Sequence, residues 1–450
     1  MKIILNLSLF LGSFFACAGT LELSISHPIS GDLPVISING ESGVTYEIQS
    51  STDLVNFESV DSMTLDGESG LWVIPNTSDY AFFRVVELDS PVEGFQIDTL
   101  PDIVFVSIPE GSFSMGDKDA KGPIADTYTT ERVVNISGFE MSEAEITTQQ
   151  YVTFLNAALA DGLIEVVEQV VGPPGTFVFG TEQSSYQGHK LIDLSGSRVL
   201  KDHDGDTTID PENPLNQCWV EYDLSTQAFS VKDPQSVDWD AYVYEEGESR
   251  ADWEDLAEGN LPTMEEVAQW PVTFIKWYGA YAFADYYGVA LPTEAQWEYA
   301  AQGGQGHVYP SDDGSMDASK ANYNEDNAHP DRGHVVAVKS YPPNPFGLYD
   351  LAGNVWEWCA DWFDPDFYSN SPDPDFDPFN DQLVLDDTEP LESPDYTGGP
   401  GQAYNADTKV KRGGSWNFHQ ASLESSARER DFTWRGNDHF GFRVVTQTAP

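Results

Sequence analysis

Residues 344–363 read NPFGLYDLAGNVWEWCADWF, and residues 410–416 read VKRGGSW. Glycine and tryptophan punctuate both stretches, and the same character runs from Asp102 to the end of the chain. With 37 glycines and 28 prolines in 450 residues, this composition favours a loop-rich architecture over long helices. We therefore expect the chain around these stretches to be built mainly from turns, short strands and a few short helices.

Three segments before this stretch have the apolar spacing of helices. The first is predicted to begin near Thr147, and the second to run from 277 to 287 with Gly288 as its C-terminal stop. The third begins in LPTEAQWEYAA, where Thr293 and Gln296 form a capping box. Their apolar residues are expected to face a core rather than a cofactor: Tyr151, Phe154, Leu155, Ala158, Trp277, Ala280, Tyr281, Ala284, Trp297, Ala300 and Ala301.

Two further regions have a different pattern. Residues 19–95 alternate apolar and polar in short runs such as LELSIS and VTYEIQSS, which predicts the strands of a small all-β sandwich. Residues 88–99 form the expected linker to a main domain over 96–450. Between the first two helices lies an acidic segment, about 160–268, which is too long for a plain loop. It is interpreted as an insertion with its own strands, such as QCWVEYDL and QAFSVKD.

The N-terminus has the features of a secretory signal peptide over residues 1–18. Lys2 precedes an apolar stretch over 3–15, and an A-x-A sequence follows at 16–18. The apolar run is too short for a membrane span. A second interpretation makes Cys17 the acylated first residue of a lipoprotein. In both cases the protein is expected to be exported, to the periplasm, the cell surface or the exterior.

The charge balance excludes one class of partner. The chain has 75 Asp and Glu against 21 Lys and Arg, a formal net charge of −54. Nucleic acid would be repelled, because its binding requires Lys and Arg to neutralise phosphates. The 25 phenylalanines, 20 tyrosines and 12 tryptophans argue that this acidic chain nevertheless folds.

Several motifs then identify a family resemblance. IPEGSFSMG, LPTEAQWEYAA, GLYDLAGNVWEW, RGGSW and HFGFRVV follow one another over about 102–448. In this set and order, the sequence resembles the formylglycine-generating enzyme (sulfatase-modifying factor) family. The resemblance implies a loop-rich α+β domain with a C-type-lectin-like core, held by tryptophan packing and bound calcium. In this chain the small all-β sandwich would precede it.

The resemblance does not extend to the family's reaction. The oxidase members convert a sulfatase cysteine to formylglycine with copper, oxygen and two cysteines in the loop after GGS(W/Y). Here that loop reads GGSWNFHQASLESSARER, and no cysteine follows Cys359. Copper is not expected, because Cu(I) needs soft thiolate ligands. After cleavage at Ala18, Cys218 and Cys359 remain, either as one disulfide or as two buried thiols. A thiol pair displaced to these positions is the alternative that would keep the oxidase reaction.

The resemblance also implies calcium, a hard cation that prefers six to eight oxygen ligands. At the main site the resemblance assigns the side chains of Asp350 and Glu357 with the carbonyls of Gly353 and Val355. The alternative for this site is that the two carboxylates only cap turns. At a second site it assigns Asn322 and the carbonyl of Tyr323, with Asp331 as a third ligand that is misaligned with the family pattern.

Independently of the family, DHDGDTTID at residues 202–210 has the aspartate spacing of calcium loops in thrombospondin-type repeats. Alternate side chains converge when the chain curls at Gly205, and four carboxylates so close would repel one another without a cation. A chain this acidic also produces such strings by chance, which is the alternative. The expected ligands are Asp202, Asp204, Asp206 and Asp210.

The last forty residues are far less acidic than the rest of the chain. Basic and aromatic residues gathered on so negative a protein suggest a site for an anionic or peptide ligand. The alternative is that Arg428 and Arg443 only pair with core carboxylates. The expected ligand contacts are Ser415, Trp416, Asn417, His419, Arg428 and Trp434.

These observations together predict an exported, calcium-stabilised member of the family that works as a binding module without catalytic residues. Its ligand would be a peptide, a protein or a glycan. The alternative is an enzyme: a formylglycine-generating oxidase acting on a sulfatase, or another enzyme that uses the same pocket.

Overall fold

The computed structural model describes residues 22–26, 35–39, 45–51, 58–64, 69–73, 82–87, 101–116, 131–169, 175–196, 215–237, 261–324, 333–364, 367–370, 376–381 and 408–447. The chain divides into two compact units, Met1–Thr99 and Leu100–Pro450. No helix among the described residues has the length and apolar character needed to span a bilayer.

The N-terminal unit consists of short antiparallel strands, as the period-2 alternation predicts. They form two three-stranded sheets, in the orders β1-β2-β5 and β4-β3-β6. The packing of the two sheets as a sandwich stays a prediction, because the side chains of this unit lie outside the described residues. The strands are β1 Glu22–Ser26, β2 Val35–Asn39, β3 Thr45–Ser51, β4 Glu58–Thr64, β5 Ser69–Val73 and β6 Phe82–Glu87.

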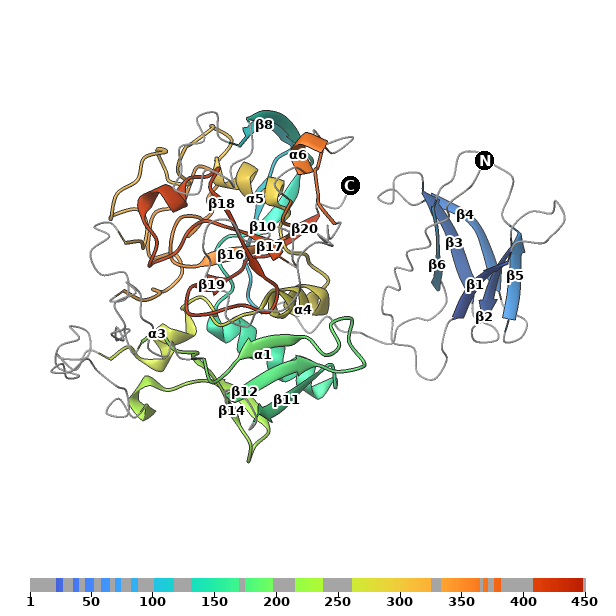
Figure 1. The fold of residues 1–450 in the computed structure, drawn as a ribbon, viewed down its shortest axis with the longest axis horizontal. Helices are drawn as coiled ribbons and strands as arrows, with labels where there is room; N and C mark the ends of the chain where they lie inside the picture. The colour runs from blue at the N-terminus through green and yellow to red at the C-terminus, as the bar shows by residue number, and fades with distance from the viewer. Residues whose placement is uncertain are drawn as a thin grey trace, which may run out of the picture. The chain divides into compact units, whose positions relative to one another are not determined.

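The C-terminal unit combines helices with several small sheets, an α+β architecture (Figure 1). A four-stranded sheet has the order β18-β17-β16-β19, with β16 and β19 parallel. β10 lies between β20 and β7, and β8 pairs with β9. These strands are β7 Phe105–Ile108, β8 Gly111–Met115, β9 Arg132–Ile136, β10 Phe139–Ser142, β16 Trp356–Trp362, β17 Thr408–Arg412, β18 Arg428–Phe432, β19 Phe440–Gly441 and β20 Val445–Gln447.

The three predicted helices are present in this unit. Helix α1, Thr148–Ala160, begins at the N-cap Thr147, and α4, Trp277–Tyr287, ends at Gly288 with φ 67°. Helix α5, Glu294–Ala301, has the Thr293–Gln296 capping box. The other helices among the described residues are α3 Met264–Ala268, α6 Phe367–Asn370 and the 3-10 helices η1 Pro234–Ser236 and η4 Gln420–Leu423.

The segment between α1 and α4 carries its own strands, as expected for the acidic insertion. β11, β12 and β13 form one sheet, and β14 pairs with β15 in a hairpin. Figure 1 shows the strands of the insertion grouped with α1, apart from the four-stranded sheet. Their bounds are β11 Ile164–Gln169, β12 Gly175–Gly180, β13 Lys190–Asp193, β14 Val220–Asp223 and β15 Ala228–Val231.

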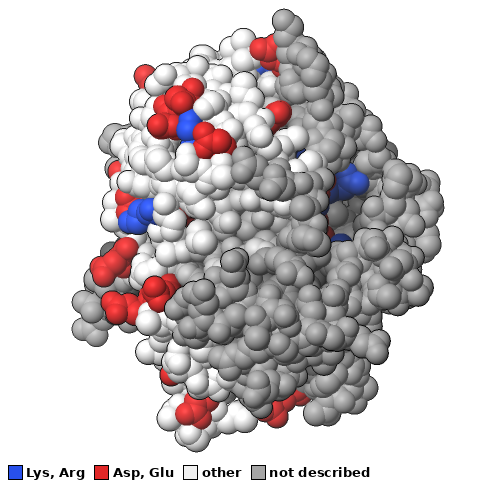
Figure 2. All heavy atoms as spheres, turned by 90° about the vertical axis from the view of Figure 1, so that its left-hand side faces the viewer, with Lys and Arg blue, Asp and Glu red and all other residues white. Residues whose placement is uncertain are grey.

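The C-terminal unit has two main hydrophobic cores. One joins α1 and α4 to the insertion strands and includes Cys218 and Trp416. The other gathers around α5 and β8 to β10, and it includes Trp297 and Cys359. On the face drawn in Figure 2, acidic side chains lie at several separate places rather than in one patch.

Candidate functional site

Three loop segments that are distant in sequence meet at the glycine turn before Ser415. The Gly353 amide donates to the Gly413 carbonyl (2.8 Å), and the Asn354 amide donates to the Asn322 carbonyl (2.8 Å). Gly353 has φ 78°, and a Cβ there would lie only 2.2 Å from the Asn322 oxygen. Only glycine satisfies both constraints. The motifs DLAGNVWE and RGGSW therefore form one rigid structure.

A chain of polar contacts follows the turn. Ser415 Oγ donates to Asn417 Oδ1 (2.7 Å), and Asn417 Nδ2 lies 3.5 Å from His439 Nδ1. The same His439 nitrogen lies 3.0 Å from Asp438 Oδ1. Because the Ser415 hydroxyl donates to an amide oxygen, no base accepts its proton, and the arrangement differs from that of an activated serine nucleophile.

The Trp416 side chain lies inside the protein, with 3% of its surface exposed. A Cβ at Gly333 would lie 3.0 Å from Trp416 Cε3, so the backbone of Gly333 covers the indole. Asn216, in the insertion, donates from Nδ2 to the Gly333 carbonyl (3.0 Å). The insertion thus helps to cover Trp416. This corrects the expectation that Trp416 contacts a ligand directly.

The two cysteines of this unit are separate, buried free thiols. Cys218 lies in the core with α1 and α4, and Cys359 lies in the core around α5. Burial raises the pKa of Cys218 to about 11 and also raises the pKa of Cys359. Reactive cysteines have lowered pKa values in partly exposed, electropositive surroundings. Both thiols therefore have the properties of structural rather than catalytic cysteines.

Arg428 is a core residue, with 3% of its surface exposed. Its Nε and Nη2 donate to the two carboxylate oxygens of Glu294, at 2.7 and 2.8 Å. Arg412 lies beside this pair, 3.4 Å from Glu294 and hydrogen bonded to Glu298. The expectation that Arg428 contacts a ligand is therefore wrong, and the alternative of a core ion pair describes it. The physical reason is that a buried carboxylate needs a bidentate partner.

Arg443 is likewise paired with a buried carboxylate, that of Glu357. Its Nε and Nη2 donate to the two oxygens of Glu357, at 2.7 and 2.8 Å. Trp297 Nε1 donates to the same carboxylate (2.7 Å). Glu357 is fully buried, so these three bonds are what makes its burial possible.

A second and a third carboxylate lie close to Glu357. Asp350 accepts from the Lys339 amide (2.7 Å), and Glu145 accepts from Asn354 Nδ2 (2.7 Å). Burial raises the pKa of Asp350 to about 6. Burial, with the charges of Asp350 and Glu357, raises the pKa of Glu145. Among the described residues, three buried carboxyl groups thus lie around the Arg443 guanidinium, and their proximity favours the uncharged forms of Glu145 and Asp350.

The expected calcium ligands are placed as follows. Asp350, Gly353 and Val355 lie in the loop before β16 and Glu357 in that strand, and the Asn322 carbonyl accepts from the Asn354 amide of the loop. Across the described ranges, no group of three or more His, Cys, Asp or Glu has the geometry of a metal site. The expected sets combine one or two side chains with carbonyls, so that observation does not test them. Asp331, Asp202, Asp204, Asp206 and Asp210 lie outside the described residues.

Residues 95–448 match the family described as the sulfatase-modifying factor enzyme 1-like domain. The chain belongs to this family. It is similar to the formylglycine-generating enzyme of Streptomyces coelicolor, with 30% identity over 277 residues, which is 59% of this chain and 71% of that enzyme.

Other similar proteins have different names. The chain is 38% identical to the serine/threonine-protein kinase pkn1 of Chlamydia pneumoniae over 188 residues, 42% of this chain and 26% of the kinase. The chain thus spans about a quarter of the length of this relative. Among solved structures, PvdO from Pseudomonas aeruginosa has 17% identity and a TM-score of 0.43, over 76% of this chain and 94% of that one.

Some important residues of this sulfatase-modifying factor domain were not found from the sequence. Glu294 and Glu298 are one helical turn apart on α5, and each is 1% exposed. In the sequence, however, two glutamates at this spacing have the pattern of a solvent-facing helix surface. The sequence did contain a signal that these two glutamates are buried, because Trp297 and Ala301 require the same helix to be buried on most sides. Glu145 had no such signal, since its partners come from residues 350–357.

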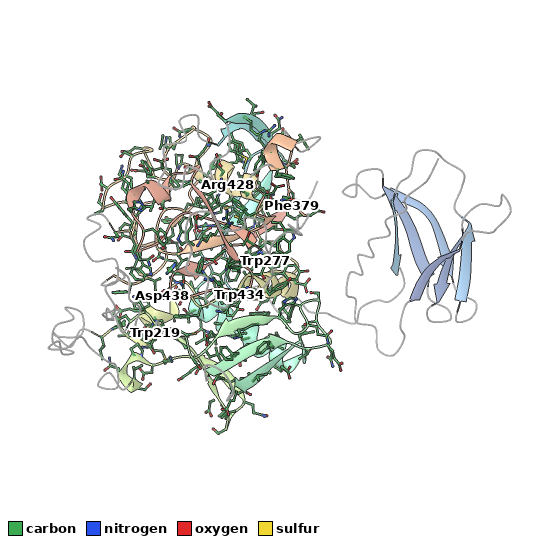
Figure 3. The ribbon with its side chains drawn as sticks, viewed as in Figure 1. Trp219, Trp277, Phe379, Arg428, Trp434 and Asp438 are labelled. Atoms are coloured by element: carbon green, nitrogen blue, oxygen red, sulfur yellow. The ribbon has the colours of Figure 1, made fainter. Side chains whose placement is uncertain are left out.

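The remaining expected ligand contacts differ in accessibility. Asn417 and His419 are half-buried. Trp434 has 49% of its surface exposed, and it lies near Trp277 in Figure 3. The structure therefore separates the six expected contacts: Ser415, Trp416 and Arg428 are buried, whereas Trp434 is the most exposed.

Proposed function

We propose that this protein is an exported, non-oxidase binding member of the sulfatase-modifying factor family. The observation that carries the proposal is the loop after Ser415. It holds Phe418 and Leu423, and Leu423 is fully buried in an apolar cluster. Phe418 packs edge-on against Trp356, with 5.2 Å between the ring centroids. Apolar side chains supply no ligand for copper.

The oxidase alternative has a direct test. We expect no conversion of cysteine to aldehyde when the protein is incubated with copper, oxygen and a peptide carrying Cys-x-Pro-x-Arg. The reason is that both thiols are buried and have raised pKa values. Mass spectrometry of the peptide measures the reaction, and an active formylglycine-generating enzyme serves as the positive control. Turnover that Cys218→Ser or Cys359→Ser abolishes would establish the oxidase instead.

Calcium stabilisation is a second part of the proposal. The Asp350 carboxylate and the carbonyls of Gly353 and Val355 are hard oxygen ligands, which calcium prefers, as is the Glu357 carboxylate, which also accepts from Arg443 and Trp297. Glu145 and Asp350 have raised pKa values beside Glu357, and a bound cation would favour the ionised forms of these carboxyl groups. Asn322 with the Tyr323 carbonyl, from the family resemblance, and Asp202, Asp204, Asp206 and Asp210, from their spacing, are proposed as further calcium sites.

Removal of calcium is expected to destabilise the native protein. A cation bound only to the native state stabilises it by about 2.7 kcal/mol when its free concentration is 100 times Kd. We expect excess chelator to lower the melting temperature by several degrees, and added calcium to restore it. Differential scanning calorimetry at constant pH measures the shift, with magnesium as the control addition. A melting curve that chelator leaves unchanged would remove calcium from the proposal.

Export is proposed from the N-terminal sequence alone. Residues 1–18 carry the basic start, the apolar stretch and the A-x-A sequence of a cleavable signal peptide. Acylation at Cys17 is the alternative form of the same proposal. N-terminal sequencing of the mature protein distinguishes the two, since a lipoprotein would begin at a modified Cys17 and a secreted protein at Gly19.

A further inference from the structure

A groove with a volume of about 560 Å³ lies between α1, α3 and β15. Its base consists of Val152, Phe229 and Val231, whose side chains are 4–6% exposed. Ala268 of α3 and Asn156 of α1 are half-buried lining residues. We call this hollow the α1–α3 groove. Its base is apolar, and four of these five residues are aliphatic or aromatic.

The rim of the α1–α3 groove is open to solvent. Met264, at the start of α3, has 51% of its surface exposed although its side chain is apolar. Methionine is common on surfaces that bind apolar partner side chains, because its flexible thioether adapts to different shapes. The other exposed lining residues are polar: Gln149, Ser230, Glu265 and Gln269.

Hydrogen bonds fix the shape of the groove. The Phe229 amide donates to Asn156 Oδ1 (2.8 Å), and Asn156 Nδ2 donates to the Phe229 carbonyl (2.9 Å). The amide and Oγ1 of Thr148 both donate to the Trp270 carbonyl, at 2.8 and 3.1 Å, which joins the start of α1 to the chain just after α3. Because the backbone of Phe229 is already bonded, β15 cannot accept an added strand at this point. The groove can therefore recognise a ligand only by its side chains.

The charges beside the groove select the sign of the ligand. Glu265 lines the groove, and Glu266 follows it on α3. Neither pairs with a basic side chain in the part of the chain that the structure describes. None of the described lining residues is a Lys or Arg, and Lys232, next to Val231, donates to Gln217 (3.0 Å). A basic ligand is therefore attracted to this rim and an acidic one is repelled.

The composition of the groove favours a protein over other occupants. A sugar stacks on an exposed aromatic face, whereas Phe229, the one ring among the described lining residues, is 4% exposed. A small molecule is usually enclosed on most sides, whereas half of these lining residues are exposed. An open groove between two helices, with an aliphatic base and an exposed methionine, matches the mode in which a partner helix inserts its apolar face.

We infer that the α1–α3 groove binds a basic amphipathic helix of a partner protein. Apolar side chains of that helix contact Val152, Phe229 and Val231, and its Lys or Arg residues face the carboxylate of Glu265. None of the groove's lining residues belongs to the loop after Ser415, so this site goes beyond the proposed function and is tested separately from it.

Fluorescence anisotropy of labelled model peptides with the full chain tests the inference. The probes are a helical peptide that repeats Leu-Leu-Lys-Lys, the same peptide with Glu in place of Lys, and a scrambled peptide of the basic composition. We expect saturable binding of the first probe, weaker binding of the scrambled peptide and no binding of the acidic one. Met264→Ala and Glu265→Lys should each raise the Kd of the first probe about fivefold, because they remove an apolar contact and a charge attraction.

Two matched variants are the controls. Leu224→Ala removes an apolar side chain that is 66% exposed but does not line the groove. Glu110→Lys makes the same change in net charge as Glu265→Lys at an exposed position between β7 and β8. Both variants should leave the Kd of the first probe unchanged. The urea midpoints of all four variants should equal that of the wild type, because the substituted side chains are exposed.

Weaker binding by the two groove variants alone supports the inference. Lack of saturable binding by the basic helical peptide, equal binding of the scrambled peptide, or equal weakening by Glu110→Lys and Glu265→Lys overturns it. A dimer that Met264→Ala dissociates would assign the groove to a second copy of the chain, and binding of octylamine without the peptide would assign it to a small amine. Either of these two results also overturns the inference.

Discussion

Replacement of Arg428 by methionine is expected to lower the free energy of unfolding by about 3–5 kcal/mol. The change removes both bonds to Glu294, whose carboxylate is 1% exposed and would be left next to Asp361 without its bidentate partner. Neighbouring Arg412 balances only part of this charge, because it is also bonded to Glu298. Urea unfolding followed by tryptophan fluorescence measures the change, provided that the m-value stays constant.

A matched variant separates the buried role from a surface role. Arg435 has 34% of its side chain exposed, and Arg435→Met is expected to change the free energy of unfolding by no more than about 0.5 kcal/mol. If Arg428→Met and Arg435→Met unfolded at the same urea concentration, the core ion pair would not contribute as described. Loss of ligand binding by a normally stable Arg428→Met protein would also contradict the buried position.

Truncation of Trp297 is the second change with a large expected effect. Trp297→Ala should destabilise the protein by about 3–5 kcal/mol, because the indole is fully buried and its removal leaves a cavity. Its Nε1 is also one of the donors to Glu357, and the Arg412 guanidinium lies 5.5 Å from its ring centroid. The indole thus contacts both buried ion-pair clusters. Thermal and urea unfolding both measure the loss.

Trp434→Ala is the control for this variant. It removes the same side chain from an exposed position, so its free energy of unfolding should stay within about 0.5 kcal/mol of the wild-type value. Similar destabilisation by the two variants would show that Trp297 is not the core residue described here.

Local features of this fold could be predicted because their causes lie within a few residues. Capping boxes join residues three apart, and Gly288 ends α4 because the stop needs a left-handed backbone. The short strands of the N-terminal unit follow from period-2 alternation. The strands of the insertion were predicted near 220–223 and 228–231 for the same reason.

Long-range pairing could not be predicted from one sequence. Arg428 bonds Glu294 across 134 residues, and nothing near Arg428 distinguishes it from a surface arginine. The cover over Trp416 depends on Gly333 and Asn216, which belong to different segments. The ligand contacts expected in the last forty residues therefore stay a prediction, except that Arg428 and Trp416 lie in the core.

The strands β19 and β20 pair with strands that precede them in the sequence. β20 pairs with β10, and β19 pairs with β16. Arg443, between β19 and β20, donates to the Ser142 carbonyl, 301 positions earlier in the chain. During synthesis these contacts cannot form until residues 440–447 have left the ribosome. Folding of the C-terminal unit is therefore expected to finish only after Arg443 has been synthesised, and a stop codon before Arg443 should prevent the unit from folding.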